Sequence, residues 1–129
     1  MGGDEVGADL VHKDLSYQIV GLAMNVYNVL GSGFLEKVYE NAMMVAFRKA
    51  GIEAEQQASV KVPFDGEVVG EYYADILVEN QIILELKVVS EISNIHRDQL
   101  LNYLKATKLR LGMILNFGKQ KLEYLRFVN

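Results

Sequence analysis

The sequence contains no cysteine and a single proline, and it has no apolar run approaching the ~20 residues of a membrane span. The absence of cysteine excludes disulfides, zinc–thiolate sites and iron–sulfur clusters, and it is compatible with a reducing cytoplasm. The acidic start, Met-Gly-Gly-Asp-Glu-Val, is unlike a signal peptide. We therefore expect a cytoplasmic protein that does not enter a membrane.

The length and composition indicate one globular domain. A chain of 129 residues is large enough to bury one core. Hydrophobic residues make up 50% and charged residues 23% of the sequence, which is ordinary globular composition. We interpret residues 1–12 as a flexible lead-in and residues 13–129 as the domain.

Positive charge is scarce overall but is concentrated near the end of the chain. The formal net charge is −4, which argues against a nucleic-acid-binding protein. Residues 97–129, however, hold seven Lys and Arg against two acids, a net charge of +5. A basic final third beside an acidic body can follow a phosphate backbone while the acids hold metal. From charge alone, an unevenly charged solvated surface is the interpretation that we favour.

Hydrophobic periodicity predicts helices and strands in the order ααβββαββ. Ser16 or Asp14 is the expected N-cap of the first helix, and Gly31 is its expected end. The other predicted elements are a helix at 33–50, strands at 55–62, 67–78 and 81–89, a helix at 94–107, and strands at 111–116 and 122–128. The first of these strands is expected to end at Pro63. This order predicts an α/β fold, a single-domain sandwich in which helices flank a mixed central sheet.

The segment Glu85-Leu86-Lys87 lies in a strongly apolar predicted strand. Residues two apart in a strand point to the same face, so the carboxylate and the ammonium group lie side by side. Burying unpaired charges costs several kcal/mol, and a strand covered on both faces should avoid that cost. The segment is therefore a candidate site, and a simple ion pair on an exposed face is the alternative.

The preceding strand contains a single acid, Asp75, among apolar residues. If the two strands form a hairpin, Asp75 and Glu85 converge, and their carboxylates repel each other unless a cation lies between them. Oxygen ligands without cysteine or clustered histidine favour Mg²⁺ or Mn²⁺. Such an ion polarises a phosphodiester and lowers the pKa of a bound water, while Lys87 positions that water or balances charge. A metal-free core pair of Asp75 with Lys87 is the alternative.

The spacing of Asp75 and Glu85 also predicts the geometry of the hairpin. The two residues face each other only if the numbers of paired residues sum to 160, which requires a loop with an odd number of residues. A three-residue loop centred on Asn80 meets this requirement, with the irregular backbone at Asn80 or its neighbour. The same pairing predicts Tyr73 opposite Lys87.

Two helices add polar side chains to this candidate site. Gln99 and Tyr103 are i, i+4 neighbours in the third helix, and His96 shares their face. A Gln amide and a Tyr hydroxyl beside a metal carboxylate can orient ligands and contact phosphate or a stacked base. In the second helix Glu36 can reach the ion directly or through water, and it shares a face with Tyr39. The alternatives are a solvated His96, a core Tyr103, and an exposed Glu36 that favours the helix dipole.

Three motifs in this order resemble those of a known family. Residues 33–39, Gly-Phe-Leu-Glu-Lys-Val-Tyr, resemble the motif that names the GxxExxY family. Asp75 with Glu85-Leu86-Lys87 resembles the D…ExK signature of PD-(D/E)XK nucleases. The pentapeptide from Gln99 to Tyr103 is similar to the QxxxY motif of the RecB-type and lambda-exonuclease-like branch. The resemblance extends from about residue 15 to Phe117-Gly118.

The resemblance implies a restriction-endonuclease-like sandwich with a mixed central sheet. It implies Asp75, Glu85 and the backbone carbonyl of Leu86 as metal ligands, Lys87 as the catalytic lysine, and Glu36 as the helix carboxylate. We count Gln99 with Lys87, Asp75 and Glu85 as catalytic. One departure from the family pattern is Lys108, where we expect glycine after Ala106-Thr107.

We expect a metal-dependent nuclease that hydrolyses phosphodiester bonds, in DNA, with Mg²⁺ or Mn²⁺ as cofactor. The residues expected to contact nucleic acid are Tyr103, His96, Tyr39 and Lys105. The alternative is a non-catalytic module that retains the nuclease fold and binds nucleic acid or a protein partner. The apolar first helix and several exposed-looking tyrosines also favour a homodimer.

Overall fold

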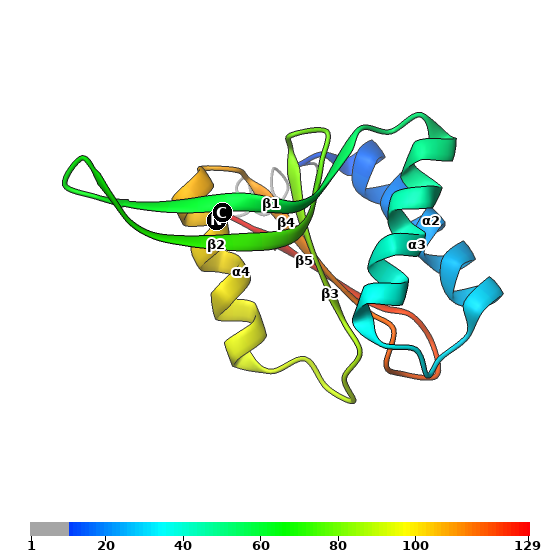
Figure 1. The fold of residues 1–129 in the computed structure, drawn as a ribbon. Helices are drawn as coiled ribbons and strands as arrows, with labels where there is room; N and C mark the ends of the chain where they lie inside the picture. The colour runs from blue at the N-terminus through cyan, green and yellow to red at the C-terminus, as the bar shows by residue number, and fades with distance from the viewer. Residues whose placement is uncertain (1–10) are drawn as a thin grey trace, which may run out of the picture.

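Helices and strands within the described residues follow the predicted order ααβββαββ, and they form the α/β sandwich of Figure 1. The structure is a computed structural model that describes residues 11–129. Of the predicted lead-in, residues 1–12, the first ten residues lie outside the described part of the chain. The elements are α2 (Lys13–Leu30), α3 (Glu36–Ala50), β1 (Ala54–Phe64), β2 (Glu67–Val78), β3 (Ile82–Lys87), α4 (Asn94–Thr107), β4 (Leu111–Asn116) and β5 (Glu123–Val128).

The five strands form one mixed sheet in the order β1-β2-β3-β4-β5. Strands β3 and β4 are parallel, and α4 connects them; the other neighbours are antiparallel. Parallel neighbours require a crossover connection, which is why a helix separates β3 from β4 in the sequence. The predicted mixed sheet with flanking helices is thereby confirmed.

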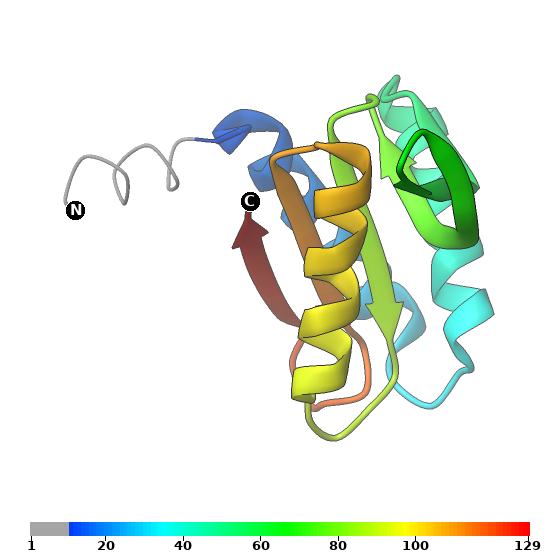
Figure 2. The same ribbon diagram turned by 90° about the vertical axis from the view of Figure 1, so that its left-hand side faces the viewer.

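Helices α2 and α3 pack on one face of the sheet and α4 packs on the other, as the turned view in Figure 2 shows. The larger core lies under α2 and α3 and includes Ile19, Phe47 and Leu84. The smaller core lies under α4 and includes Ile83 and Leu100. Successive residues of β3 thus enter different cores, because side chains alternate across a strand. This two-sided burial explains the continuous apolar run of β3.

Several predicted boundaries are wrong: α3 begins at Glu36 and not at residue 33, and β3 ends at Lys87 and not at residue 89. Helix α2 begins at Lys13 with His12 at the N-cap, ahead of the predicted Asp14 or Ser16, although Gly31 ends the helix as expected. Strand β1 continues through Pro63, where the register with β2 shifts after Val62. Proline is tolerated there because β1 is an edge strand and the shift is a local irregularity. No helix among residues 11–129 has the length and apolar character needed to cross a membrane.

The β2–β3 hairpin confirms the predicted register. Ile76 pairs with Leu84 and Val78 pairs with Ile82, so paired residues sum to 160. The loop has three residues, and Glu79 and Asn80 have left-handed backbones with φ of 51° and 55°. The ladder ends at Ile76–Leu84, however, and the predicted position of Tyr73 opposite Lys87 is wrong. Beyond this point β2 remains paired only with β1.

The two faces of the β1–β2 hairpin exchange sides at the point where the hairpin leaves the rest of the sheet. Gln57 has a left-handed backbone with φ of 54°, and it interrupts the ladder between Gln56–Ile76 and Ala58–Ala74. Ile76 belongs to the core under α2 and α3, whereas Ala74 belongs to the core under α4. The hairpin therefore changes faces here and continues as an arm, residues 58–74, that packs against α4 through Val60 and Ala74 and extends past that helix (Figure 1).

Candidate functional site

The gap where β2 parts from β3 contains the two predicted carboxylates. The Asp75 backbone N–H donates to Glu85 Oε2 (2.8 Å), and the Leu86 backbone N–H donates to Asp75 Oδ2 (2.8 Å). Each carboxylate thus accepts a hydrogen bond from a backbone N–H of the opposite strand, in place of the backbone–backbone hydrogen bond of a regular sheet. The structure therefore brings Asp75, Glu85 and the Leu86 backbone together, as the sequence predicted.

Burial gives these carboxylates unusual proton affinities. Burial, followed by the negative charge of Asp75, raises the pKa of Glu85 from 4.5 to about 8. Burial also raises the pKa of Asp75, against the opposing effect of the Leu86 amide, and the charges of Glu40 and Glu36 add to the rise. Without a cation, Glu85 therefore keeps its proton at neutral pH. Strong displacement of a buried pKa toward neutrality is a common property of functional sites.

Lys87 lies at the end of β3, half-buried, one residue beyond Leu86. Its positive charge lowers the pKa of both Asp75 and Glu85, although burial and the other acids outweigh it. Among the described residues Lys87 forms no ion pair with either carboxylate. The predicted metal-free alternative, a core pair of Asp75 with Lys87, is therefore not the arrangement of the structure.

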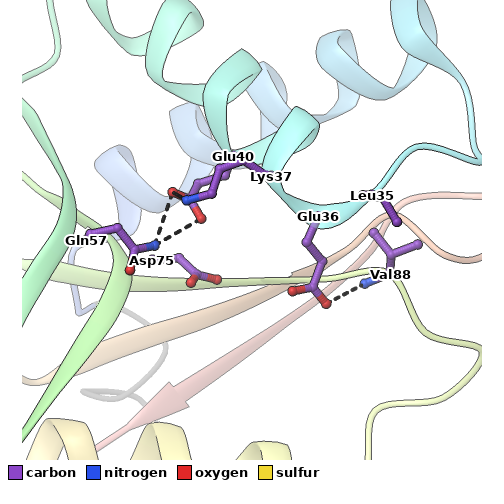
Figure 3. A pocket seen from close by; sticks show the side chains of 7 residues that line it. All are labelled: Leu35, Glu36, Lys37, Glu40, Gln57, Asp75 and Val88. Atoms are coloured by element: carbon purple, nitrogen blue, oxygen red, sulfur yellow. Dashed lines mark hydrogen bonds and ion pairs between the residues drawn. The ribbon is translucent and has the colours of Figure 1, made fainter.

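An open cavity of about 530 Å³ lies between the first turns of α3 and the gap in the sheet. Its lining residues, shown in Figure 3, are Leu35, Glu36, Lys37, Glu40, Gln57, Asp75 and Val88. Glu36 Oε2 accepts a hydrogen bond from the Val88 backbone N–H (3.3 Å), which ties the start of α3 to the segment after Lys87. The cavity therefore gives solvent and ligands access to Asp75.

Glu40 is a buried acid in this cavity that the sequence analysis did not select for a role. Its side chain pairs with Lys37 Nζ (3.0 Å) and accepts hydrogen bonds from Gln56 Nε2 (2.5 Å) and Gln57 Nε2 (3.2 Å). These partners offset the cost of burying the carboxylate. The turned backbone of Gln57 brings its amide to Glu40, and no sequence signal marks that turn. The spacing of Glu40 from Glu36, one helical turn, was the only available indication.

The donor set fits a small divalent cation held by two carboxylates. Asp75 and Glu85 offer hard oxygen atoms, and a cation in the gap would replace the proton that Glu85 otherwise holds. Among residues 11–129, no three Asp, Glu or His side chains lie close enough together to hold an ion. Glu36, bonded to Val88, does not complete such a cluster, so a third protein ligand would come from the backbone or from Glu36 through water.

The residues of the predicted GxxExxY motif perform three separate structural tasks. Gly33 has φ of 106°, in the left-handed region that side chains rarely adopt, and Glu36 reaches Val88. Tyr39 is fully buried, donates its hydroxyl to the Gly31 carbonyl (2.6 Å), and stacks on Phe117 with ring centroids 4.4 Å apart. The prediction that Tyr39 contacts nucleic acid is therefore wrong, because its ring is a core side chain.

Gln99 and Tyr103 lie on the α4 side of the gap. Both line a separate cavity of about 320 Å³, together with residues of the β1–β2 arm. Burial and the nearby charge of Glu85 raise the pKa of the Tyr103 hydroxyl to about 12. Tyr103 is buried in the core cluster that contains Ala74, the residue before Asp75, which agrees with its alternative interpretation as a core tyrosine.

The other two predicted contacts, His96 and Lys105, line neither cavity. His96 Nδ1 accepts a hydrogen bond from the Ser93 backbone N–H (3.2 Å), which completes a capping box at the start of α4. This bond assigns His96 a structural role at the helix terminus. Lys105 is exposed on α4 and lines neither cavity, so it contacts nucleic acid only if the strand follows the outer surface of the helix.

Asn116 holds the backbone that follows Lys87, and the sequence analysis missed this role. The side chain is fully buried at the end of β4, where it donates to the Val89 carbonyl (2.9 Å) and to Glu123 Oε1 (3.0 Å). Its Oδ1 accepts from the Val89 N–H (3.1 Å) and the Gly118 N–H (3.0 Å). Asn116 thereby fixes the exit of β3, which carries Lys87. The only signal in the sequence was a polar residue at the end of an apolar strand.

Comparisons with known proteins agree with this fold. The sequence matches the family described as the PD-(D/E)XK nuclease superfamily over residues 13–127. No curated protein matches the chain. Among solved structures, the crystal structure of SSO0001 is similar, with a TM-score of 0.56 and 17% sequence identity. The match covers 73% of this chain and 50% of that one, so this chain spans about half the length of SSO0001. At this identity the similarity shows the fold alone.

Proposed function

The chain belongs to the PD-(D/E)XK nuclease superfamily, and on that premise we propose that it is a divalent-metal-dependent nuclease that hydrolyses phosphodiester bonds in DNA. Membership of a nuclease superfamily whose members generally use divalent metals supports nucleic acid as the ligand. One observation carries the proposal for this chain. Asp75 and Glu85 meet in a gap of the sheet, where burial leaves one of them protonated unless a cation replaces the proton.

Asp75 and Glu85 are the proposed metal ligands, with the Leu86 carbonyl as a third and Glu36 acting through water. When bound, Mg²⁺ or Mn²⁺ polarises the phosphodiester and lowers the pKa of water. Lys87 is placed by β3 next to Leu86 and is held there by Phe117, whose backbone N–H donates to the Lys87 carbonyl (2.8 Å). Its ammonium group orients the attacking water or balances the negative charge that develops on the phosphate. Gln99 is proposed to hold the substrate at the same site from α4.

The proposal is tested by Mn²⁺ titration calorimetry together with cleavage of labelled single- and double-stranded DNA. We expect cleavage with Mg²⁺ or Mn²⁺ and none with EDTA, because the two carboxylates need the cation. Asp75→Ala and Glu85→Ala should lose Mn²⁺ binding, whereas Lys87→Ala should bind Mn²⁺ and lose turnover. Glu91→Gln, at an exposed glutamate outside both cavities, is the control and should behave like the parent. Metal-independent cleavage, or carboxylate variants that bind Mn²⁺ normally, would contradict the mechanism.

A non-catalytic binding module is the second candidate function. It is favoured because, within the described residues, no three Asp, Glu or His side chains are grouped closely enough to hold a metal ion. Such a module would bind nucleic acid or a protein partner through the same fold. Failure to cleave single-stranded, duplex, flapped and RNA substrates, with nucleic-acid binding retained, would favour this second candidate.

Two finer assignments belong to the same proposal. Placement in the GxxExxY family is supported by the separate roles of Gly33, Glu36 and Tyr39 in shaping the start of α3. A cytoplasmic location is supported by a sequence without cysteine, which does not depend on an oxidising compartment.

A further inference from the structure

The cavity of about 320 Å³ on the α4 side is built from two elements that are distant in the sequence. Its lining residues are Val62 and Tyr72 from the β1–β2 arm and Ile95, Asp98, Gln99, Asn102 and Tyr103 from α4. Of these residues, the proposed function uses only Gln99. The volume is near the lower end of the roughly 300–1,000 Å³ found for small-ligand sites, which suits a single flat group.

The walls of this cavity are aromatic and apolar, and much of that surface faces solvent. The Tyr72 ring lies over Tyr103 with centroids 5.8 Å apart and an interplanar angle of 40°. Tyr72 is 52% exposed and Ile95 is 78% exposed. Neither side chain is explained by the core of the domain. A flat group that covers them would remove apolar surface from water and stack on an aromatic face.

The rim supplies hydrogen-bonding groups that are not used elsewhere among the described residues. Asp98, Gln99 and Asn102 are all exposed, and their side chains make no hydrogen bonds within that part of the chain. Amide side chains match the edge of adenine, and a carboxylate accepts from an exocyclic amino group. The carboxylate repels phosphate, so this rim suits the edge of a base better than the backbone of a nucleic acid.

We propose that this cavity holds one unpaired nucleobase of the substrate strand, beside the scissile phosphodiester. This inference rests on the proposed function and specifies its substrate. Tyr103 lines the cavity and belongs to the same core cluster as Ala74, which directly precedes Asp75, so a base held here lies on the α4 side of the carboxylate pair. A base in a duplex is stacked and paired, and must first be extruded. The protein therefore acts on single strands, flaps or frayed ends in preference to intact duplex.

Neighbouring tyrosines of the arm give a matched pair of variants. Tyr72 and Tyr73 are adjacent in β2 and similarly exposed, at 52% and 54%, but only Tyr72 lines the cavity. Tyr72→Leu and Tyr73→Leu each keep an apolar side chain while removing the aromatic ring. Binding is measured in EDTA, which prevents metal-dependent hydrolysis, by fluorescence anisotropy of a labelled single-stranded oligodeoxyadenylate and of the same length of abasic strand. Cleavage of both strands is then measured with Mn²⁺.

We expect the parent to bind the base-containing strand at least about fivefold more tightly than the abasic strand, from one aromatic–base stack. Tyr72→Leu should lose that preference, and Tyr73→Leu should keep it. Equal parental affinity for the two strands, including no measurable binding of either, would overturn the inference. Equal effects of the two substitutions would overturn it as well. A parent that binds with the base preference but does not cleave, together with loss of that preference in Tyr72→Leu, would support the base-binding cavity and refute the proposed catalysis. Failure of the inference and failure of the proposed function therefore give different results.

Discussion

Replacing Glu85 by glutamine should make the metal-free protein more stable at alkaline pH. Glu85 has a pKa of about 8 in the folded protein, against 4.5 for an ordinary glutamate. Between these values the unfolded chain releases the proton and the folded protein keeps it, so folding stability falls as pH rises from about 4.5 to about 8. Below that window the substitution has no electrostatic effect, and above it the effect is constant.

The expected magnitude follows from the width of that window. Each pKa unit corresponds to about 1.4 kcal/mol, so the full effect of Glu85 is on the order of 5 kcal/mol. This is comparable with the total stability of a marginal domain. Glutamine keeps an oxygen that can accept the hydrogen bond from the Asp75 amide, which the carboxylate accepts at 2.8 Å. The variant should therefore lose the ionisation without losing this contact.

The assay is urea denaturation at several pH values from 5 to 9 in EDTA, followed by circular dichroism because the chain has no tryptophan. The parent should lose stability across this range, and Glu85→Gln should lose much less. Glu91→Gln, which changes an exposed glutamate, should follow the parent. Added Mn²⁺ should stabilise the parent most at the alkaline end and should stabilise Glu85→Gln little, since metal binding competes with the proton. Parallel stability curves for the parent and Glu85→Gln would refute the reasoning.

Three further predictions concern the scaffold. Lys108→Gly should raise the free energy of unfolding by about 0.5–1 kcal/mol, because Lys108 caps α4 with φ of 63°; a lower urea midpoint would contradict this. Gly118→Ala should lower it by about 1–3 kcal/mol or more, since a Cβ there overlaps the Val89 backbone, whereas Gly21→Ala in open space should not destabilise. A homodimer is expected because α2 exposes Tyr17 at 82%; monomer at all micromolar concentrations in sedimentation would remove this prediction.

Much of the candidate site was predictable because the residue types and the register are local properties of the chain. An isolated acid in one apolar strand and a Glu-x-Lys pattern in the next identify Asp75, Glu85 and Lys87. For Asp75 and Glu85 to face each other, the numbers of paired residues must sum to 160, and the structure has this register. The three-residue loop around Asn80 makes the register possible because short polar residues such as Asn tolerate a left-handed backbone. The order of helices and strands likewise follows from hydrophobic periodicity, which depends only on neighbouring residues.

The tertiary structure decided which candidate side chains are accessible and which partners they meet. Sequence pattern does not distinguish a tyrosine that lines a cavity from one that completes a core, so Tyr39 was placed wrongly and the position of Tyr72 in a cavity wall was not predicted. The turn at Gln57, which brings the Gln57 amide to the buried Glu40, has no local signature. The pKa of Glu85 also depends on burial by segments far along the chain. These features arise from long-range packing, whose energy is shared among residues that no short stretch of sequence contains.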